Sequence, residues 1–245
     1  MQCNVKHEKQ IMTDFNSRIF SHLKTTAGSH WSEYVEHEFV RQLGDGSLPR
    51  EAFLHYLKQD YVFLINYSRA WALAVVKSDR IDEMRIAAAT VNGLIDEEIK
   101  LHIATCEREG IDESTLGQLA EEPENLAYTR FVMDIGLRGD LLDLMASLAP
   151  CVFGYGEIGL RLASRIKGPL QDQPYGEWIA TYVGDEYQQV CNAVGAMMDN
   201  VASRRIGGDL ADSPRSADLQ SIFNMACDLE TSFWSMGLKL VPSRQ

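Results

Sequence analysis

The chain has few of the features that mark metal-binding or redox proteins. Its five cysteines, at positions 3, 106, 151, 191 and 227, are widely spaced, and no CxxC pair occurs. A zinc ribbon and a thioredoxin-type centre are therefore excluded. An odd number of scattered cysteines is typical of free thiols, which persist in a reducing compartment. The sequence accordingly predicts a cytoplasmic protein.

Basic residues are scarce relative to acidic ones. Lys and Arg number 23 against 35 Asp and Glu, which gives a formal net charge of −12. A negative field of this size repels phosphate backbones and anionic lipid surfaces, so we expect neither a nucleic-acid nor a membrane partner. The first residues contain no apolar signal-peptide core, and no uncharged apolar stretch approaches 18 residues.

Histidine does not occur in the pattern that carboxylate di-iron bundles require. Those sites use Glu-x-x-His, and none of the six histidines has a glutamate three residues before it. We therefore expect no metal and no cofactor. Glu98 and His102 are four residues apart, which favours an ion pair on one face of a helix.

Glycine and proline are also few, at 18 and 7 residues, and 45% of the chain is apolar, which indicates a globular protein. Apolar side chains recur at three- and four-residue steps, the period of a helix. This pattern predicts an all-α fold, a single-domain helical bundle over residues 1–245 whose first ten residues are a flexible extension. The expected helices span 10–26, 50–78, 81–109, 124–138, 140–166, 175–204 and 216–238, with a loop over 207–216.

Three polar side chains lie in strongly apolar helical stripes. Asp60 shares a face with large aromatic residues, and Glu230 lies in the apolar stripe of the last helix. A buried carboxylate needs a reason, which is either a structural hydrogen bond or a functional role. Cys151 follows Pro150, and a helix that restarts there would place the thiol in a first turn that favours the thiolate. The alternative is a cysteine that acts as a small buried apolar residue.

Three motifs in order resemble the TenA/thiaminase II family, in its cysteine-containing subgroup. They occupy residues 59–64 with Tyr67, residues 150–159 around Cys151, and residues 230–237, and the resemblance extends over residues 14–240. It implies a haem-oxygenase-like fold and a homotetramer. It also implies an enzyme of thiamin salvage that hydrolyses the bond between the 5-methylene of a 4-amino-2-methylpyrimidine and its leaving group, giving hydroxymethylpyrimidine. The leaving group is an amine or the thiazole of thiamin, and the sequence leaves that choice open.

The resemblance also assigns roles to residues. By position, Cys151 corresponds to the nucleophile, Asp60 to the acid that binds the pyrimidine, and Glu230 to the acid/base that serves the leaving group and water. The remaining substrate-binding residues implied are aromatic: Phe63, Tyr67, Tyr128, Tyr155, Tyr182 and Phe233.

This chain departs from the family pattern at two aromatic positions. Phe63 stands where tyrosine is common, which removes a hydroxyl near Glu230, and Phe153 stands where tryptophan is common in the pocket wall. Tyr187 is the alternative to Tyr182, because the loop before both makes the correspondence less secure.

Two other functions remain open from the sequence. A haem or non-haem iron oxygenase shares the expected fold but would need a proximal histidine or a repeated Glu-x-x-His, and the latter is absent here. A non-catalytic protein that binds thiamin-related ligands for regulation would keep the pocket without turnover. We expect hydrolysis, in which the Cys151 thiolate adds to the ring, Asp60 activates it and Glu230 moves protons.

Overall fold

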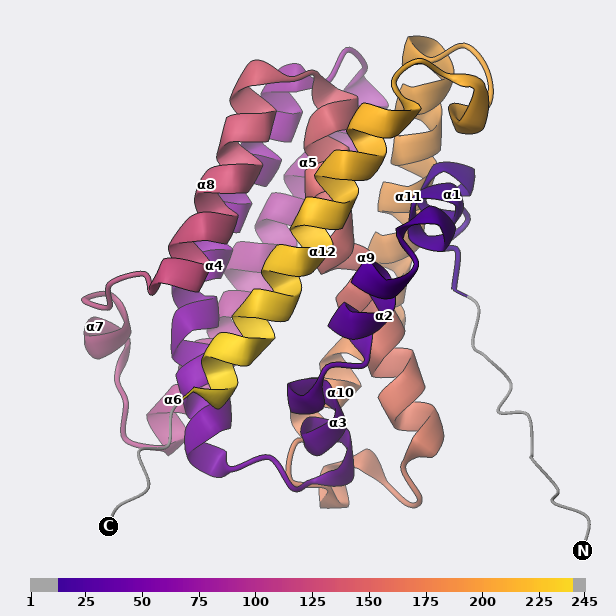
Figure 1. The fold of residues 1–245 in the computed structure, drawn as a ribbon. Coiled ribbons are helices and arrows are strands. Elements are labelled where there is room, and N and C mark those ends of the chain that lie inside the picture. The colour runs from indigo at the N-terminus through magenta and orange to yellow at the C-terminus, as the bar shows by residue number, and fades with distance from the viewer. Residues whose placement is uncertain (1–12, 240–245) are drawn as a thin grey trace, which may run out of the picture.

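A computed structural model describes residues 13–239, and within these residues every regular element is helical (Figure 1). The all-α prediction is therefore confirmed. The α-helices are α1 (Arg18–Ala27), α2 (Ser29–Val35), α3 (Glu38–Asp45), α4 (Arg50–Lys77), α5 (Ile81–Gly93), α6 (Ile99–Arg108), α7 (Glu113–Leu116), α8 (Pro123–Arg138), α9 (Leu141–Arg165), α10 (Gly176–Val183), α11 (Asp185–Arg205) and α12 (Ser216–Leu238). A π-helical turn, η1 (Leu94–Glu98), joins α5 to α6, and the short 3₁₀ turns are η2 (Leu170–Asp172) and η3 (Leu210–Asp212).

Helix α9 is the centre of the bundle. It packs against α4, α8, α10, α11 and α12 (Figure 1). Its length and composition would suffice to cross a membrane, but 94% of its most apolar window is buried inside the protein, as in the core helix of a globular bundle. A capping box fixes its start, since Asp140 accepts from the N–H groups of Leu142 and Asp143, and the Asp143 carboxylate accepts from the Asp140 N–H.

Pro150 lies inside α9 without ending it. The helix expected over 140–166 is confirmed, because α9 is continuous from Leu141 to Arg165, and a restart at Pro150 does not occur. Cys151 is therefore in mid-helix and has no first-turn dipole beside it. Gly154, one turn later, lets the Tyr34 ring reach the helix, because a Cβ there would collide with that ring. The Tyr34 hydroxyl donates to the Pro150 carbonyl at 3.2 Å.

The helices predicted at 50–78, 124–138 and 216–238 are also confirmed to within one residue, whereas the remaining predictions differ in detail. The helix expected at 10–26 begins at Arg18, because Phe15 and Asn16 have positive φ angles that no helix accepts. Its residues 10–12, like the predicted extension over residues 1–10, lie outside the described residues. Helices α2 and α3 were not predicted, since seven or eight residues repeat the helical period only twice.

Two long helices of the prediction are interrupted. The segment 175–204 divides at Gly184, whose extended ψ of 147° separates α10 from α11. The segment 81–109 contains η1, where one extra residue widens the turn. The predicted 207–216 loop is present with η3 inside it, and Arg215 at its end donates to Asp140 and Asp143, which ties the loop to the start of α9.

Candidate active site

A cavity of about 510 Å³ opens between η1, α9 and the α10–α11 junction. Two of the predicted site residues, Cys151 from α9 and Tyr67 from α4, line it directly. The other predicted residues form a buried cluster behind the thiol and do not line the open part of the cavity: Asp60, Phe63, Tyr128, Tyr155, Tyr182, Glu230 and Phe233. Cys151 is therefore the point at which a buried polar cluster meets the cavity.

The Cys151 thiol is only 8% exposed and is surrounded by acids. Burial raises its pKa well above the ordinary value, and the charges of Glu230, Glu98 and Asp60 raise the pKa further. A hydrogen bond with Tyr67 lowers the pKa but does not reverse the shift. In the empty cavity Cys151 is thus a thiol, contrary to the thiolate expected from a helix N-terminus. Its activation needs a neighbouring proton acceptor.

Glu230 is such an acceptor. It comes from α12, is 2% exposed, and accepts a hydrogen bond from the Tyr128 hydroxyl at 2.9 Å. Burial raises its pKa to about 8, and the charge of Asp60 raises it further, whereas hydrogen bonds with Tyr128 and Cys151 lower it. The side chains of residues 151 and 230 are therefore direct neighbours, and a carboxyl with a pKa near 8 can both accept and give a proton near neutral pH.

Asp60 is held on one oxygen by two donors. Its Oδ2 accepts from the Tyr56 hydroxyl at 2.8 Å and lies 2.7 Å from His102 Nε2. The other ring nitrogen, Nδ1, lies 2.8 Å from the Glu98 backbone carbonyl, which can only accept. With Asp60 ionised, both nitrogens of His102 must carry a proton, so His102 is a cation. Burial lowers the pKa of His102, but the hydrogen bond and charge of Asp60 outweigh burial and leave the pKa raised.

The predicted ion pair between the Glu98 and His102 side chains is wrong. His102 contacts the Glu98 backbone, and its ionic partner is Asp60, 42 residues earlier in the chain. The Glu98 carboxyl accepts instead from the Tyr182 hydroxyl at 2.6 Å. Glu98 and His102 thus belong to the buried cluster behind Cys151. The only sequence signal for them was their four-residue spacing, which places a histidine and an acid on one face of a helix.

Aromatic rings join the three acids and the thiol into one cluster. Phe63 lies 5.2 Å from Tyr67, 5.0 Å from Tyr128 and 5.4 Å from Phe233, measured between ring centroids. The Tyr155 hydroxyl lies 3.4 Å from that of Tyr56 and can donate to it, since the Tyr56 proton goes to Asp60. A flat apolar ligand would be enclosed by such walls.

The two candidate tyrosines from α10 and α11 lie side by side. The rings of Tyr182 and Tyr187 are 4.9 Å apart, and Tyr187 lines the cavity while Tyr182 binds Glu98 behind it. Phe153 packs against Phe15 and Phe20 and is not among the described residues that line the cavity.

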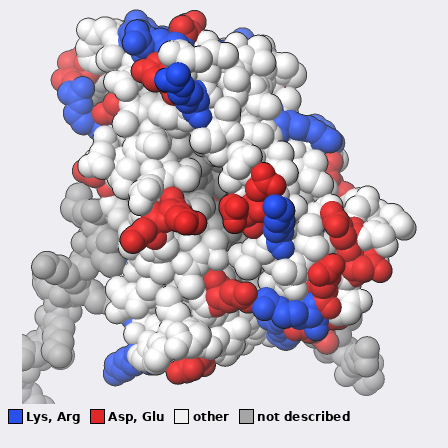
Figure 2. Space-filling model, turned by 180° about the vertical axis from the view of Figure 1, so that it is seen from behind, with Lys and Arg blue, Asp and Glu red and all other residues white. Residues whose placement is uncertain are grey.

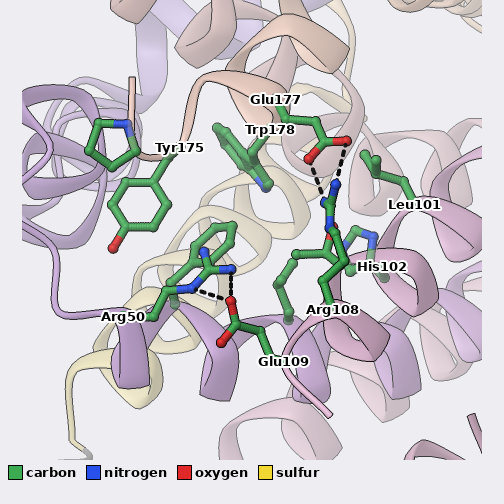
Figure 3. A pocket seen from close by; sticks show the side chains of 12 residues that line it. Arg50, Leu101, His102, Arg108, Glu109, Tyr175, Glu177 and Trp178 are labelled. Carbon is green, nitrogen blue, oxygen red and sulfur yellow. Dashed lines mark hydrogen bonds and ion pairs between the residues drawn. The ribbon is translucent and has the colours of Figure 1, made fainter. Parts of the chain in front are cut away.

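A second, smaller cavity of about 200 Å³ is lined by His102 and shares Leu101 with the first (Figure 3). Two ion pairs cross it, Arg50 with Glu109 and Arg108 with Glu177, as the dashed lines show. Each arginine is thus neutralised within the protein. Within residues 13–239, no group of three His, Cys, Asp or Glu residues is arranged to hold a metal ion.

Known proteins are similar to this chain over most of its length. The model of the TENA/THI-4/PQQC family matches residues 25–240. An aminopyrimidine aminohydrolase of Halalkalibacterium halodurans is 34% identical over 206 residues, which are 84% of this chain and 89% of the relative. A crystal structure of a protein described as a TenA family transcription regulator, from Silicibacter, is 52% identical with a TM-score of 0.88, and the match covers 93% of this chain and 100% of that one.

A more distant structural neighbour bears on the fold alone. A domain of unknown function from Shewanella denitrificans, described as having a heme oxygenase-like fold, superimposes with a TM-score of 0.68 at 12% identity. The match covers 89% of this chain and 91% of that domain. The haem-oxygenase-like fold expected from the sequence is therefore confirmed.

Proposed function

Because this chain belongs to the TENA/THI-4/PQQC family, we propose that it is an aminopyrimidine aminohydrolase of thiamin salvage. Its substrate would be a 4-amino-2-methylpyrimidine with an amine or a thiazolium on the 5-methylene, and its product the hydroxymethyl pyrimidine. The Halalkalibacterium halodurans relative, which matches over most of both chains, is named an aminopyrimidine aminohydrolase. One observation carries the proposal: a thiol at the inner surface of the cavity lies beside the buried carboxyls of Glu230 and Asp60, whose charges raise its pKa.

Asp60 would orient the pyrimidine ring. Its Oδ2 is already occupied by Tyr56 and His102, so Oδ1 is the oxygen left to accept a hydrogen bond from the substrate. One such bond to the exocyclic amino group fixes the ring and keeps the carboxylate charged. The cationic His102 behind Asp60 maintains that charge in a buried site, where an unpaired carboxylate would be costly.

Proton transfer would begin at the thiol. As Cys151 Sγ forms a bond to a ring carbon, its proton passes to the Glu230 carboxylate. The raised pKa of the thiol then does not prevent the reaction, because no free thiolate has to form first. The electron pair of the addition then flows to the methylene and breaks its bond to nitrogen. Glu230 gives this proton to the departing nitrogen, which leaves as ammonia from a neutral amine or as ammonium from a protonated one, and Glu230 is again a carboxylate.

Water would complete the cycle. Glu230, again a carboxylate, takes a proton from water as the oxygen adds to the methylene. The carbon–sulfur bond then breaks, and Cys151 recovers a proton from Glu230. The sum is the substrate amine plus water giving the alcohol plus ammonia. Two acids with different surroundings thus take two different roles, one in holding the ring and the other in moving protons.

We also propose a cytoplasmic homotetramer. Support for a contact between subunits comes from apolar side chains left on the surface near one end of the bundle. Val76 at the end of α4, Ile81 at the start of α5 and Leu137 at the end of α8 are 80%, 61% and 68% exposed. Exposed apolar groups of this kind are common in protein interfaces. Sedimentation velocity measures the subunit number, and a monomer would contradict the proposal.

Release of the leaving group from a small panel of pyrimidines tests the function, measured as ammonia from the aminomethyl compound and as the free thiazole from thiamin. The panel contains 4-amino-5-aminomethyl-2-methylpyrimidine, thiamin and a pyrimidine without a leaving group. We expect turnover of at least one of the first two, and loss of that turnover in Cys151→Ala. Cys106→Ala is the matched control, because this cysteine is fully buried on α6 and does not line the larger cavity. Binding of the pyrimidines without any turnover would assign the protein to ligand binding alone.

A further inference from the structure

The larger cavity is lined by acids and by no basic side chain among the described residues. Of the side chains that line it, Glu97, Glu98, Asp185 and Glu186 carry carboxyl groups, and none is Lys or Arg. The face of the molecule in Figure 2 is hollowed between groups of acidic side chains. A cavity whose wall charges are all negative concentrates cations and repels anions.

Glu98 differs from the other three acids. Glu97, Asp185 and Glu186 are exposed, whereas Glu98 is half-buried on η1. The Tyr182 hydroxyl fixes its Oε1 at 2.6 Å, and no described residue provides a partner for Oε2. π-Helical turns often occur at functional sites, because the extra residue redirects a side chain. The turn thus presents one oriented, unpaired carboxylate oxygen in the cavity wall.

Glu98 is also close to the reacting groups. Its charge is among those that raise the pKa of Cys151. Burial raises the pKa of Glu98 itself to about 7, with a further contribution from Asp60, although the His102 cation and the Tyr182 hydrogen bond lower it. Three carboxyls, those of Glu230, Glu98 and Asp60, surround the thiol, and no Lys or Arg among the described residues lines the cavity. A positively charged ligand would favour the ionised form of Glu98, whose pKa lies near neutral pH.

We propose that Glu98 is a specificity-determining residue whose carboxylate contacts the positively charged leaving group of the pyrimidine substrate. This inference rests on the proposed function and extends it to the choice of substrate. Both candidate leaving groups carry the required charge, since an aliphatic amine is protonated at neutral pH and a thiazolium is a permanent cation. Asp60 and Glu230, each 2% exposed, lie deeper than Glu98. The ring therefore binds at the inner end on Asp60, and the cationic leaving group lies between Glu230 and Glu98.

Two ligands that differ in charge but little in shape test the inference. The aminomethyl pyrimidine is a cation at pH 7.5, and 4-amino-5-hydroxymethyl-2-methylpyrimidine is neutral. Calorimetry gives the Kd of each in Cys151→Ala protein, which prevents turnover, with and without Glu98→Gln. Glutamine keeps the size of the side chain and an oxygen for Tyr182. The Kd of the neutral ligand is also measured with the wild-type protein.

A matched variant removes a charge from the same turn outside the cavity. Asp96 lies on η1, pairs with Lys100 at 3.0 Å, and does not line the cavity, so Asp96→Asn removes a charge and a surface ion pair outside the cavity. We expect Glu98→Gln to raise the Kd of the cation at least tenfold, about 1.4 kcal/mol, and that of the neutral ligand less than threefold. Asp96→Asn should change neither Kd more than twofold.

The outcomes separate the two proposals. A shift that is the same for both ligands, no shift for either, or an equal shift in Asp96→Asn overturns the role of Glu98 while leaving the proposed function intact. If the wild-type protein does not bind the neutral pyrimidine, the proposed function fails first, and the inference fails with it. Thermal unfolding of each variant shows whether an altered Kd comes from a loss of folded protein.

Discussion

Replacing Glu230 with glutamine should change how the stability of the protein depends on pH. Burial raises the pKa of this carboxyl from 4.5 to about 8 in the folded protein. The unfolded chain releases the proton near pH 4.5, whereas the folded chain keeps it until about pH 8. Glu230 therefore contributes stability that is fully present below pH 4.5 and is lost as the pH rises toward 8. Glutamine does not titrate and keeps an oxygen for Tyr128.

The size of the effect follows from the pKa. Each pH unit between the unfolded and folded pKa values costs about 1.4 kcal/mol of unfolding free energy. Between pH 5 and pH 8 the wild-type protein should thus lose about 3 to 4 kcal/mol relative to Glu230→Gln. Other groups with raised pKa values, such as Glu98 and His102, titrate in both proteins. Their contributions cancel in the difference.

Urea unfolding at pH 5, 6, 7 and 8 measures this difference, provided that the m-values of the two proteins agree. The two stability profiles should diverge steadily with pH, in favour of the variant. Parallel profiles, separated by a constant amount to within about 1 kcal/mol, would mean that Glu230 is already ionised at pH 5. The proposed proton relay from Cys151 to Glu230 would then lose its basis.

Three further variants test other parts of the site. Cys151→Ala should lower kcat for ammonia release at least a thousandfold while changing the Kd of the hydroxymethyl pyrimidine less than about threefold; near-normal kcat would remove the nucleophile. Tyr128→Phe deletes a hydrogen bond that lowers the pKa of Glu230, so the acidic limb of kcat/KM against pH should move upward from about 8, and an unmoved limb contradicts the assignment. His102→Asn unpairs Asp60, which should raise KM about tenfold and lower stability by about 3 kcal/mol, and an unchanged KM would refute that role.

The helical fold was predictable from the sequence because long amphipathic helices repeat their pattern many times. Helices α4, α8, α9 and α12 were located to within one residue at each end. The same period missed α2 and α3, which are too short to repeat it, and passed over η1, since one extra residue barely disturbs a stripe of apolar positions.

The candidate site was predictable only in part. An acid inside an apolar stripe is visible in a sequence, so Asp60 and Glu230 stood out. The pairing of Asp60 with His102 did not, because it depends on how α6 packs against α4. The state of Cys151 was not predictable either. Its raised pKa comes from burial and from acids on three other elements, whereas the local sequence suggested only a proline and a helix start.

The central claim is that one flat heterocycle is held between Cys151, Asp60 and Glu230. A crystal structure with 4-amino-5-hydroxymethyl-2-methylpyrimidine tests it most directly. The account predicts the amino group on Asp60 Oδ1, a ring carbon in van der Waals contact with Cys151 Sγ, and the hydroxymethyl oxygen within hydrogen-bonding distance of Glu230. A pyrimidine bound in the cavity without contact to Asp60, or with its ring remote from the thiol, would contradict it.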